Sequence, residues 1–278
     1  LSATRQSTLQ SGGHLRSRRG LSPGGYLIRD FGFSEADLAE AGAYTKAIKT
    51  TRVQDAWLAN GAIKRLATDR RMTEFLSEPY QREAFAFQTL NFPKGSEQGT
   101  HSDTYHFNSI PTGFMCRVWI ALEDIHPDSG PLQYHPGSHR LPVFSNTDLN
   151  GNGPSGYLGL ADAAVNASGI IRETAKITRG QAFIWAANLF HGGSPIADPA
   201  LTRLSQVTHY YFRGCSYFTP LASANGEVFW REPYDIAAGR FVANADRSHR
   251  PRLKRRIGER LQIWTRKPHP VRLHCAGG

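Results

Sequence analysis

The sequence predicts a mainly β domain in which α-helices precede a series of short strands. The composition is that of a globular chain with many turns: 40% of the 278 residues are hydrophobic, and the chain contains 27 Gly and 16 Pro. Helical patterns dominate before residue 80. After it, runs of β-forming residues alternate with Gly- and Pro-containing turns, which is typical of a β-sandwich or barrel. No apolar run reaches the length of a membrane-spanning helix.

The N-terminal part combines a polar arm with helices. Residues 1–25 are rich in Ser, Gly and Arg, and we expect a flexible basic arm there. Ser34 precedes the segment EADLAEAGAYTKAIK, with Asp37 in the first turn, which predicts the start of a helix. Two further helical stretches are expected near Val53–Leu66 and Met72–Leu76.

The rest of the chain predicts strands, one long insertion and a terminal helix. The expected strands are Ala84–Phe92, Phe114–Leu122, Gly130–Tyr134, Gln181–Asn188 and Arg203–Arg213. Residues 144–178 show no clear periodicity, and a loop of this length is typical of a lid or binding segment. Within 246–278, apolar residues recur at helical spacing. We expect a basic amphipathic helix that packs on the sheet rather than on a membrane, followed by a tail.

Charge and cysteine content narrow the class of protein. The formal net charge is +10, but the excess lies in the two ends, and residues 21–239 carry a net charge of −3. This distribution argues against nucleic-acid binding as the main function. Three widely spaced Cys without a CxxC pair favour a reducing compartment, and residues 1–20 lack the apolar core of a signal peptide. We therefore expect a cytoplasmic location; the sequence does not indicate an oligomeric state.

One group of residues points to metal chemistry. His101 and Asp103 stand two positions apart after a strand-like segment, so in extended backbone their side chains share a face. His191 directly follows another β-like run. Two imidazoles and one carboxylate on one face of a metal ion form the facial triad of non-haem Fe(II) oxygenases. Downstream, Arg203 and Ser205 could bind a carboxylate through a guanidinium and a hydroxyl, although a salt bridge is the alternative for Arg203.

The order of these residues resembles the phytanoyl-CoA dioxygenase family of Fe(II)/2-oxoglutarate-dependent oxygenases. The matching segments are His101-Ser102-Asp103, VWIALED at 118–124, SGPL at 129–132, PGSH at 136–139, Gly180, His191 and Arg203. The resemblance implies a double-stranded β-helix (jelly-roll) core with N-terminal and flanking α-helices. That domain would span 26–245 and include the lid-like insertion near 144–178.

The resemblance also implies roles for single residues. His101, Asp103 and His191 would bind Fe(II), and Arg203, with Ser205 beside it, would bind 2-oxoglutarate. Trp119 and Gln88 match cosubstrate-pocket positions, with core packing as the alternative for Trp119. His106 and Arg117 are candidate substrate contacts. A surface or supporting role is the alternative for His106, and an internal acidic partner is the alternative for Arg117.

The reaction implied by the resemblance is hydroxylation of an unactivated C–H bond in a small-molecule substrate. It would consume 2-oxoglutarate and O₂ and release succinate and CO₂. Asp103 favours hydroxylation or desaturation over halogenation, because related halogenases carry a small apolar residue at this position. Two alternatives stay open: a cupin-type metal dioxygenase that does not use 2-oxoglutarate, and a catalytically silent binding protein on the same fold.

Overall fold

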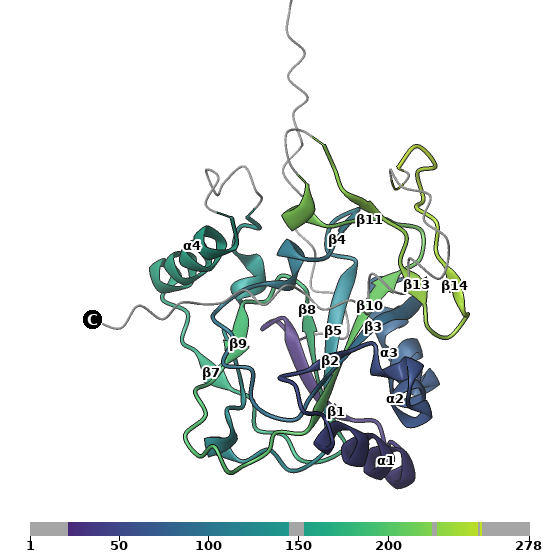
Figure 1. Ribbon diagram of the computed structural model, residues 1–278. Coiled ribbons are helices and arrows are strands. Elements are labelled where there is room, and N and C mark those ends of the chain that lie inside the picture. Colours follow the sequence, from purple (N-terminus) through teal and green to yellow (C-terminus); the bar gives the residue numbers. More distant parts are fainter. Residues whose placement is uncertain (1–21, 145–152, 224–226, 250, 252–278) are drawn as a thin grey trace, which may run out of the picture.

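The structure is a computed structural model that describes residues 22–144, 153–223, 227–249 and 251 (Figure 1). Nearly all of the predicted N-terminal arm and most of the predicted C-terminal helix therefore lie outside the described residues. Two antiparallel sheets form the core of the molecule, with helices α1 to α3 beside the larger sheet and α4 beside the smaller one. This arrangement is the predicted mainly β jelly-roll with flanking helices.

The larger sheet has six strands, and every neighbouring pair is antiparallel. In spatial order these are β1 (Tyr26–Asp30), β8 (Gln181–Ala186), β5 (Met115–Ala121), β10 (Ser205–Phe212), β3 (Ala84–Phe92) and β2 (Val53–Gln54). The smaller sheet consists of β7 (Glu173–Thr174), β6 (Leu132–Tyr134) and β9 (His191–Gly193). Four of the expected strands, at 84–92, 114–122, 181–188 and 203–213, form the middle of the larger sheet.

The described chain also contains two small sheets and several 3-10 helices. One small sheet contains β4 (Asn108–Ile110), β11 (Ser216–Phe218) and β12 (Trp230–Arg231), and a second pairs β13 (Tyr234–Asp235) with β14 (Arg240–Phe241). The 3-10 helices are η1 (Ala56–Leu58), η2 (Asp103–Tyr105), η3 (Pro127–Ser129), η4 (Ser138–Arg140) and η6 (Pro220–Ala222).

The N-terminal helices follow local capping signals. Helix α1 (Glu35–Lys46) begins where predicted, and the Ser34 side chain accepts a hydrogen bond from the Asp37 amide. Helix α2 (Gly61–Ala67) is capped in the same way by Asn60, and α3 (Arg70–Tyr80) by Asp69.

The predicted helix at Val53–Leu66 is wrong in its first half. Val53 and Gln54 pair with Asn91 and Leu90 of β3, so this segment is an edge strand instead. The Asp55 carboxylate then accepts the amide of Thr89, also in β3. Pairing with a buried strand outweighs the weak helical preference of this stretch.

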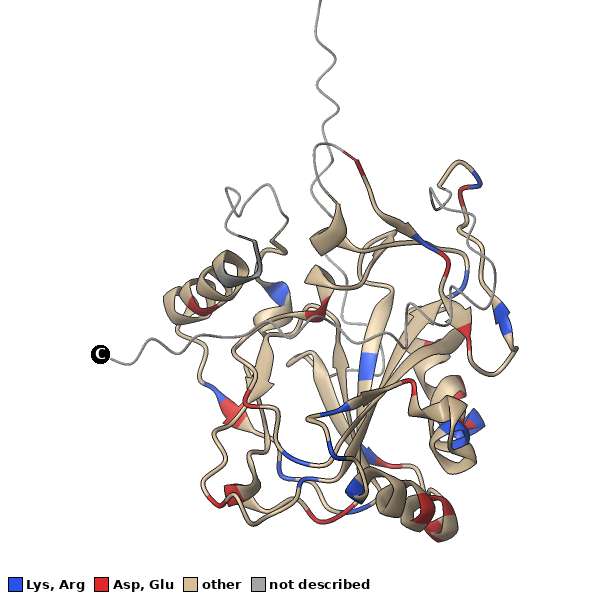
Figure 2. Ribbon diagram, in the orientation of Figure 1, with Lys and Arg blue, Asp and Glu red and all other residues tan. Residues whose placement is uncertain are grey.

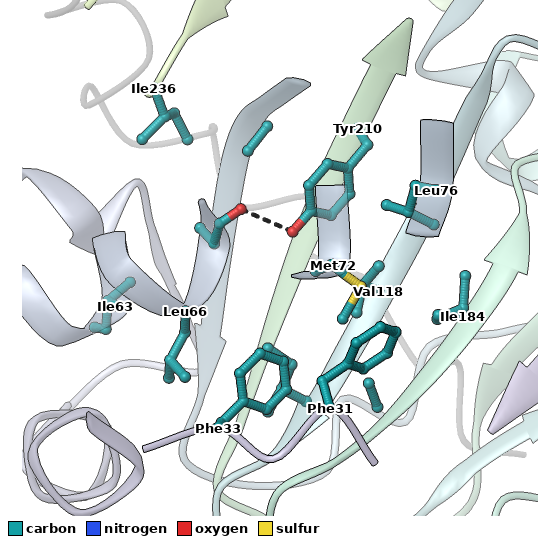
Figure 3. Packing of buried hydrophobic residues seen from close by; sticks show 14 of the residues in the cluster. Phe31, Phe33, Ile63, Leu66, Met72, Leu76, Val118, Ile184, Tyr210 and Ile236 are labelled. Atoms are coloured by element: carbon teal, nitrogen blue, oxygen red, sulfur yellow. Dashed lines mark hydrogen bonds between the residues drawn. The ribbon is translucent and has the colours of Figure 1, made fainter. Parts of the chain in front are cut away.

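A large apolar core fills the space between the helices and the outer face of the larger sheet (Figure 3). Met72 and Leu76 of α3 pack with Val118 and Ile184 of the central strands. The Tyr210 hydroxyl, buried in this core, donates a hydrogen bond to the Ala67 carbonyl at the end of α2 (2.8 Å). The helices therefore stabilise the sheet from one side and leave its other face to the interior of the jelly-roll.

Alternation along the strands places a row of polar side chains on that inner face. His209 of β10 is paired with Gln88 of β3 on one side and with Arg117 of β5 on the other. Arg117 is paired in turn with Trp185 of β8. Cross-strand partners in an antiparallel sheet lie on the same face. Trp119, two residues after Arg117, shares this face and packs between the two sheets.

The insertion near 144–178 contains a helix that the sequence pattern did not predict. Helix α4 spans Gly153–Ser168 and lies beside β9 of the smaller sheet (Figure 1). Tyr157, Ala161 and Val165 are buried, and their spacing of four residues places them on one face. In the part of the chain that the structure describes, no helix has both the length and the apolar character needed to cross a membrane.

Candidate metal centre

The backbone brings the two predicted metal-binding segments into contact. His101 and His191 form a reciprocal pair of backbone hydrogen bonds, each 2.9 Å long. The Asp103 amide donates to the Ala187 carbonyl (2.8 Å), and Asp103 begins the 3-10 helix η2. Simple alternation along an extended loop was the expected route to a shared face. The structure reaches the same convergence through this bridge and the turn that follows it.

The side chains of His101, Asp103 and His191 form a compact, buried group. Their ligand atoms lie within 4.8 Å of one another, and each residue is at most 3% exposed. Each histidine Nδ1 is hydrogen-bonded to a backbone carbonyl, that of Gly99 for His101 (2.8 Å) and that of Leu189 for His191 (2.9 Å). With Nδ1 as the donor, Nε2 is a free acceptor in both rings. The two Nε2 atoms lie 3.9 and 3.6 Å from Oδ1 of Asp103.

This arrangement fits a metal ion. Oδ1 of Asp103 is buried and makes no hydrogen bond with the described residues. Burial lowers the pKa of His191 to about 3 and also lowers the pKa of His101 well below its usual value. Both imidazoles are therefore neutral near pH 7, which is the form that binds metals. Two neutral imidazoles and one carboxylate are the ligand set of a facial triad.

The other carboxylate oxygen of Asp103 has two partners on the inner face of the larger sheet. Nε of Arg117 lies 2.8 Å from Oδ2, and the Trp185 indole donates a hydrogen bond to the same oxygen (3.1 Å). Arg117 is the basic residue in the sequence of β5, and Figure 2 shows blue within this strand. Arg117 thus has an internal acid as its partner, which was one of the two possibilities raised by the sequence. Sequence reasoning missed Trp185, although its place in a β-like run just before His191 could have suggested it.

A second polar site is formed around Arg203, which is 3% exposed. Its guanidinium lies 5.4 Å from the ring of Trp119 and 5.8 Å from that of Phe92, and one nitrogen donates to the Gly130 carbonyl (3.1 Å). None of the described acidic side chains forms an ion pair with it, although burial lowers its pKa only to about 10, so it stays charged. Nε of Arg203 and Oγ of Ser205 are buried without hydrogen-bond partners in the described chain. A carboxylate ligand fits this environment.

The remaining predicted residues lie on the inner face of the larger sheet or directly after η2. Gln88 lies in the inner-face row opposite His209. His106 follows η2, and burial with the nearby Arg117 charge lowers its pKa to about 4. Trp119 lies beside Arg203 and so belongs to the surroundings of this arginine as well as to the core.

Jelly-roll architecture with a buried His-Asp-His group defines a class of non-haem metal proteins. This chain belongs to the phytanoyl-CoA dioxygenase family, whose family model matches residues 29–203. A comparison with curated protein sequences gave no match.

Solved structures share the fold at low sequence identity. The epimerase SnoN in complex with Fe³⁺, α-ketoglutarate and nogalamycin RO is 20% identical, with a TM-score of 0.58 over 81% of this chain and 93% of that chain. EctD from S. alaskensis with 2-oxoglutarate and 5-hydroxyectoine is 18% identical, with a TM-score of 0.53 over 81% of this chain and 83% of that chain. HygX from Streptomyces hygroscopicus with nickel and 2-oxoglutarate is 15% identical, with a TM-score of 0.51 over 69% and 83%.

Proposed function

We propose that this protein is an Fe(II)/2-oxoglutarate-dependent dioxygenase that hydroxylates an unactivated C–H bond of a small molecule. One observation carries the proposal: a buried His-Asp-His group and a buried arginine, which forms no ion pair with the described acidic side chains, lie on the same side of the larger sheet. The first fits a divalent metal ion, and the second fits a carboxylate. Family membership and the 2-oxoglutarate bound in structures of similar fold support the combination.

His101, Asp103 and His191 would hold the iron, and Arg203 with Ser205 would receive the distal carboxylate of 2-oxoglutarate. Bound Fe(II), 2-oxoglutarate and O₂ would supply the oxidising chemistry, with succinate and CO₂ as products. Trp119 would line the cosubstrate site through its contact with Arg203. Gln88 remains a further candidate for the cosubstrate pocket. His106 and Arg117 remain the candidates for the substrate side, with Arg117 already paired to Asp103.

The protein itself would contribute by fixing the orientation of the metal ligands and by keeping water away from Arg203. Backbone carbonyls fix the orientation of both imidazoles, and Arg117 with Trp185 fixes the carboxylate of Asp103. Aromatic side chains surround Arg203 and keep its charge away from water, which strengthens its attraction for an anion. Such preorganisation limits the rearrangement that binding and reaction require.

Two alternative functions make different demands on the same residues. A cupin-type dioxygenase that does not use 2-oxoglutarate gives no role to Arg203. Its burial without an ion-pair partner among the acidic residues that the structure describes is then unexplained. A silent binding protein gives no reason for three competent metal ligands to converge. Similar folds also serve other reactions. SnoN is an epimerase, and SnoK, a further solved structure of similar fold with a TM-score of 0.57 and 15% identity, is a carbocyclase. The fold therefore does not by itself select hydroxylation.

The proposal is tested by succinate formation in the presence of Fe(II), 2-oxoglutarate and O₂, with candidate small molecules added. We expect the wild-type protein to produce succinate, and His191→Ala to produce none. Arg203→Met should require far more 2-oxoglutarate for the same rate. If wild-type protein that binds Fe(II) oxidises a substrate without consuming 2-oxoglutarate, the cupin-type alternative is correct. We also propose a cytoplasmic location, in keeping with three widely spaced Cys residues that form no CxxC pair.

A further inference from the structure

Helix α4 contacts the metal-binding loop through a single tyrosine hydroxyl. The Tyr157 hydroxyl accepts a hydrogen bond from the Ser102 amide (2.9 Å) and donates toward the Ser102 carbonyl (3.1 Å). It also lies 2.9 Å from Oγ of Ser102, which in turn lies 2.6 Å from Oγ1 of Thr104. Ser102 is the residue between His101 and Asp103. The backbone polar groups between two metal ligands are therefore bonded to a side chain from a helix 55 residues away.

The ring of Tyr157 strengthens this contact by stacking. It lies parallel to the ring of Tyr105, with centroids 4.0 Å apart and an interplanar angle of 5°. Tyr105 is the last residue of η2, which Asp103 begins. The side chain of Tyr157, which is 2% exposed, thus contacts Ser102 and Tyr105, the residues on either side of the segment that carries the carboxylate of Asp103.

The same face of α4 also packs on the segment that carries His191. Ala161 and Val165 form an apolar cluster with Phe190, the residue immediately before His191. Leu158 is the next residue of the helix, and a Cβ atom at Gly99 would lie 3.9 Å from its side chain. Leu158 is therefore close to the residue whose carbonyl orients His101. Helix α4 therefore touches both chain segments from which the three ligands come.

We propose that Tyr157 is a positioning residue that ties helix α4 to the metal-binding loop, so that docking of the helix and binding of the metal ion stabilise each other. The inference rests on the metal site proposed above. Its physical basis is that the loop cannot hold His101 and Asp103 in place while the Ser102 amide and carbonyl are buried without partners. Coupling of this kind is reciprocal: whatever free energy the docked helix adds to metal binding, the metal adds to helix docking.

The chain offers a matched pair of variants. Tyr157→Phe keeps the stacked ring and removes only the hydroxyl that binds Ser102. Tyr105→Phe makes the same chemical change in the other ring of the pair, but the Tyr105 hydroxyl has no hydrogen-bond partner in the described chain. A general effect of losing a buried phenol would appear in both variants, whereas loss of the tie to the loop would appear in Tyr157→Phe alone.

The first measurement is calorimetric titration of metal-free protein with Mn(II), a redox-stable stand-in for Fe(II). Supporting residues around metal ligands typically contribute about 10–100-fold to metal affinity, so we expect Tyr157→Phe to bind Mn(II) at least tenfold more weakly. Tyr105→Phe should stay close to wild type. Equal Mn(II) affinity in Tyr157→Phe and wild type would overturn the proposal. Wild-type protein that binds no Mn(II), or a His191→Ala variant that binds it normally, would instead overturn the metal site and with it the coupling.

The second measurement can already overturn the proposal with the wild-type protein alone. Amide hydrogen exchange of the wild-type protein is followed with and without Mn(II). We expect Mn(II) to slow exchange both at Ser102 and within residues 157–168, and in Tyr157→Phe to leave the exchange of α4 unchanged. If Mn(II) protects the loop of wild-type protein but not α4, helix and metal are independent and the proposal is wrong.

Discussion

Arg117 is the ion-pair partner of Asp103, with its Nε 2.8 Å from Oδ2 of the carboxylate. The pair is buried: the Asp103 side chain is fully covered and that of Arg117 is 11% exposed. Because Oδ2 is held by Arg117 and by the Trp185 indole, Oδ1 is the oxygen directed toward the two imidazoles. A residue of a central strand therefore determines which oxygen the metal-binding carboxylate presents.

The first prediction concerns the stability of the metal-free protein. Arg117→Met leaves the Asp103 carboxylate buried without its counter-charge, and breaking such a pair typically costs about 3–5 kcal/mol. We expect the free energy of unfolding, measured in urea with a chelator present, to fall by this order. Asp103→Asn alone should also destabilise the folded protein, because it leaves the guanidinium of Arg117 without its negatively charged partner.

A double-mutant cycle separates this pairing from general damage to the core. The Asp103→Asn/Arg117→Met protein has neither charge, so it should be more stable than the sum of the single effects predicts, by about 1–3 kcal/mol. Strict additivity would mean that the two side chains contribute independently, which contradicts the ion pair as the main interaction of both.

The second prediction concerns the cosubstrate. Arg203→Met removes the one charged group that we assign to the distal carboxylate of 2-oxoglutarate, and losing one partner of a buried charge pair costs about 2–5 kcal/mol. The apparent Kd for 2-oxoglutarate should therefore rise at least tenfold. Binding is measured anaerobically with Mn(II) in the site.

The affinity for Mn(II) alone should be unchanged in Arg203→Met, which serves as the control for folding and for the metal site. Arg117→Met provides a comparison, because it removes another inner-face arginine, one that is already paired to Asp103. Normal 2-oxoglutarate affinity in Arg203→Met would assign the distal carboxylate to another cation.

Local patterns allowed much of the sheet to be predicted from the sequence. The predicted strand at 84–92 coincides with β3. Its nine consecutive residues are all buried and rich in aromatic and β-forming types, so a strand is strongly preferred over a helix there. The predicted strand at 203–213 starts two residues before β10, since Arg203 and Leu204 lie in the approach to the strand rather than in its ladder. Boundaries of this kind depend on pairing, which a single sequence does not reveal.

Two features of the site could not be predicted because they depend on contacts between distant segments. Helix α4 contains three Gly residues and one Pro, all poor helix formers, so its propensity is low and packing of Tyr157, Ala161 and Val165 decides its structure. Trp185 reaches Asp103 only through the register that pairs it with Arg117. The His-Asp-His group, in contrast, was predictable from residue types and order.

The third prediction is the pH dependence of the metal-free protein. Burial lowers the pKa of His106 to about 4 and that of His191 to about 3, and it lowers the pKa values of His101 and His209 well below their usual range. As the pH falls below about 6.5, the unfolded chain takes up protons at these histidines that the folded chain does not. The free energy of unfolding should therefore decrease on acidification from pH 6.5 toward pH 4.

Two buried carboxyl groups act in the opposite direction. Burial raises the pKa of Asp55 to about 6 and also raises that of Asp103, so the folded protein takes up these protons first. Each titrating group changes the free energy of unfolding by at most about 1.4 kcal/mol per pH unit. Because four histidines outweigh two carboxyl groups, the free energy of unfolding should still decrease on acidification. Urea unfolding at several pH values in the presence of a chelator measures this net change. Constant stability between pH 6.5 and pH 5 would show that the histidines are not buried in their neutral form.

The last prediction concerns residue 103 and halide ions. With Asp103 present, the carboxylate would hold the metal at the position that a halide would need, and it already neutralises Arg117. We therefore expect wild-type protein to give oxygenated or desaturated product in high chloride, as measured by mass spectrometry of the product. We expect Asp103→Ala to bind metal weakly and to be mostly inactive, because it loses one of three ligands.

The Asp103→Ala variant should nevertheless acquire an affinity for chloride. Removing the carboxylate leaves the guanidinium of Arg117 buried beside a space of carboxylate size, and a buried cation attracts a small anion. Chloride should therefore raise the thermal unfolding temperature of metal-free Asp103→Ala relative to gluconate at the same ionic strength. Wild-type protein and the Asp103→Ala/Arg117→Met double variant should not respond. A chloride response in the double variant would place the anion elsewhere. A chlorinated product from wild-type protein would contradict the role assigned to Asp103.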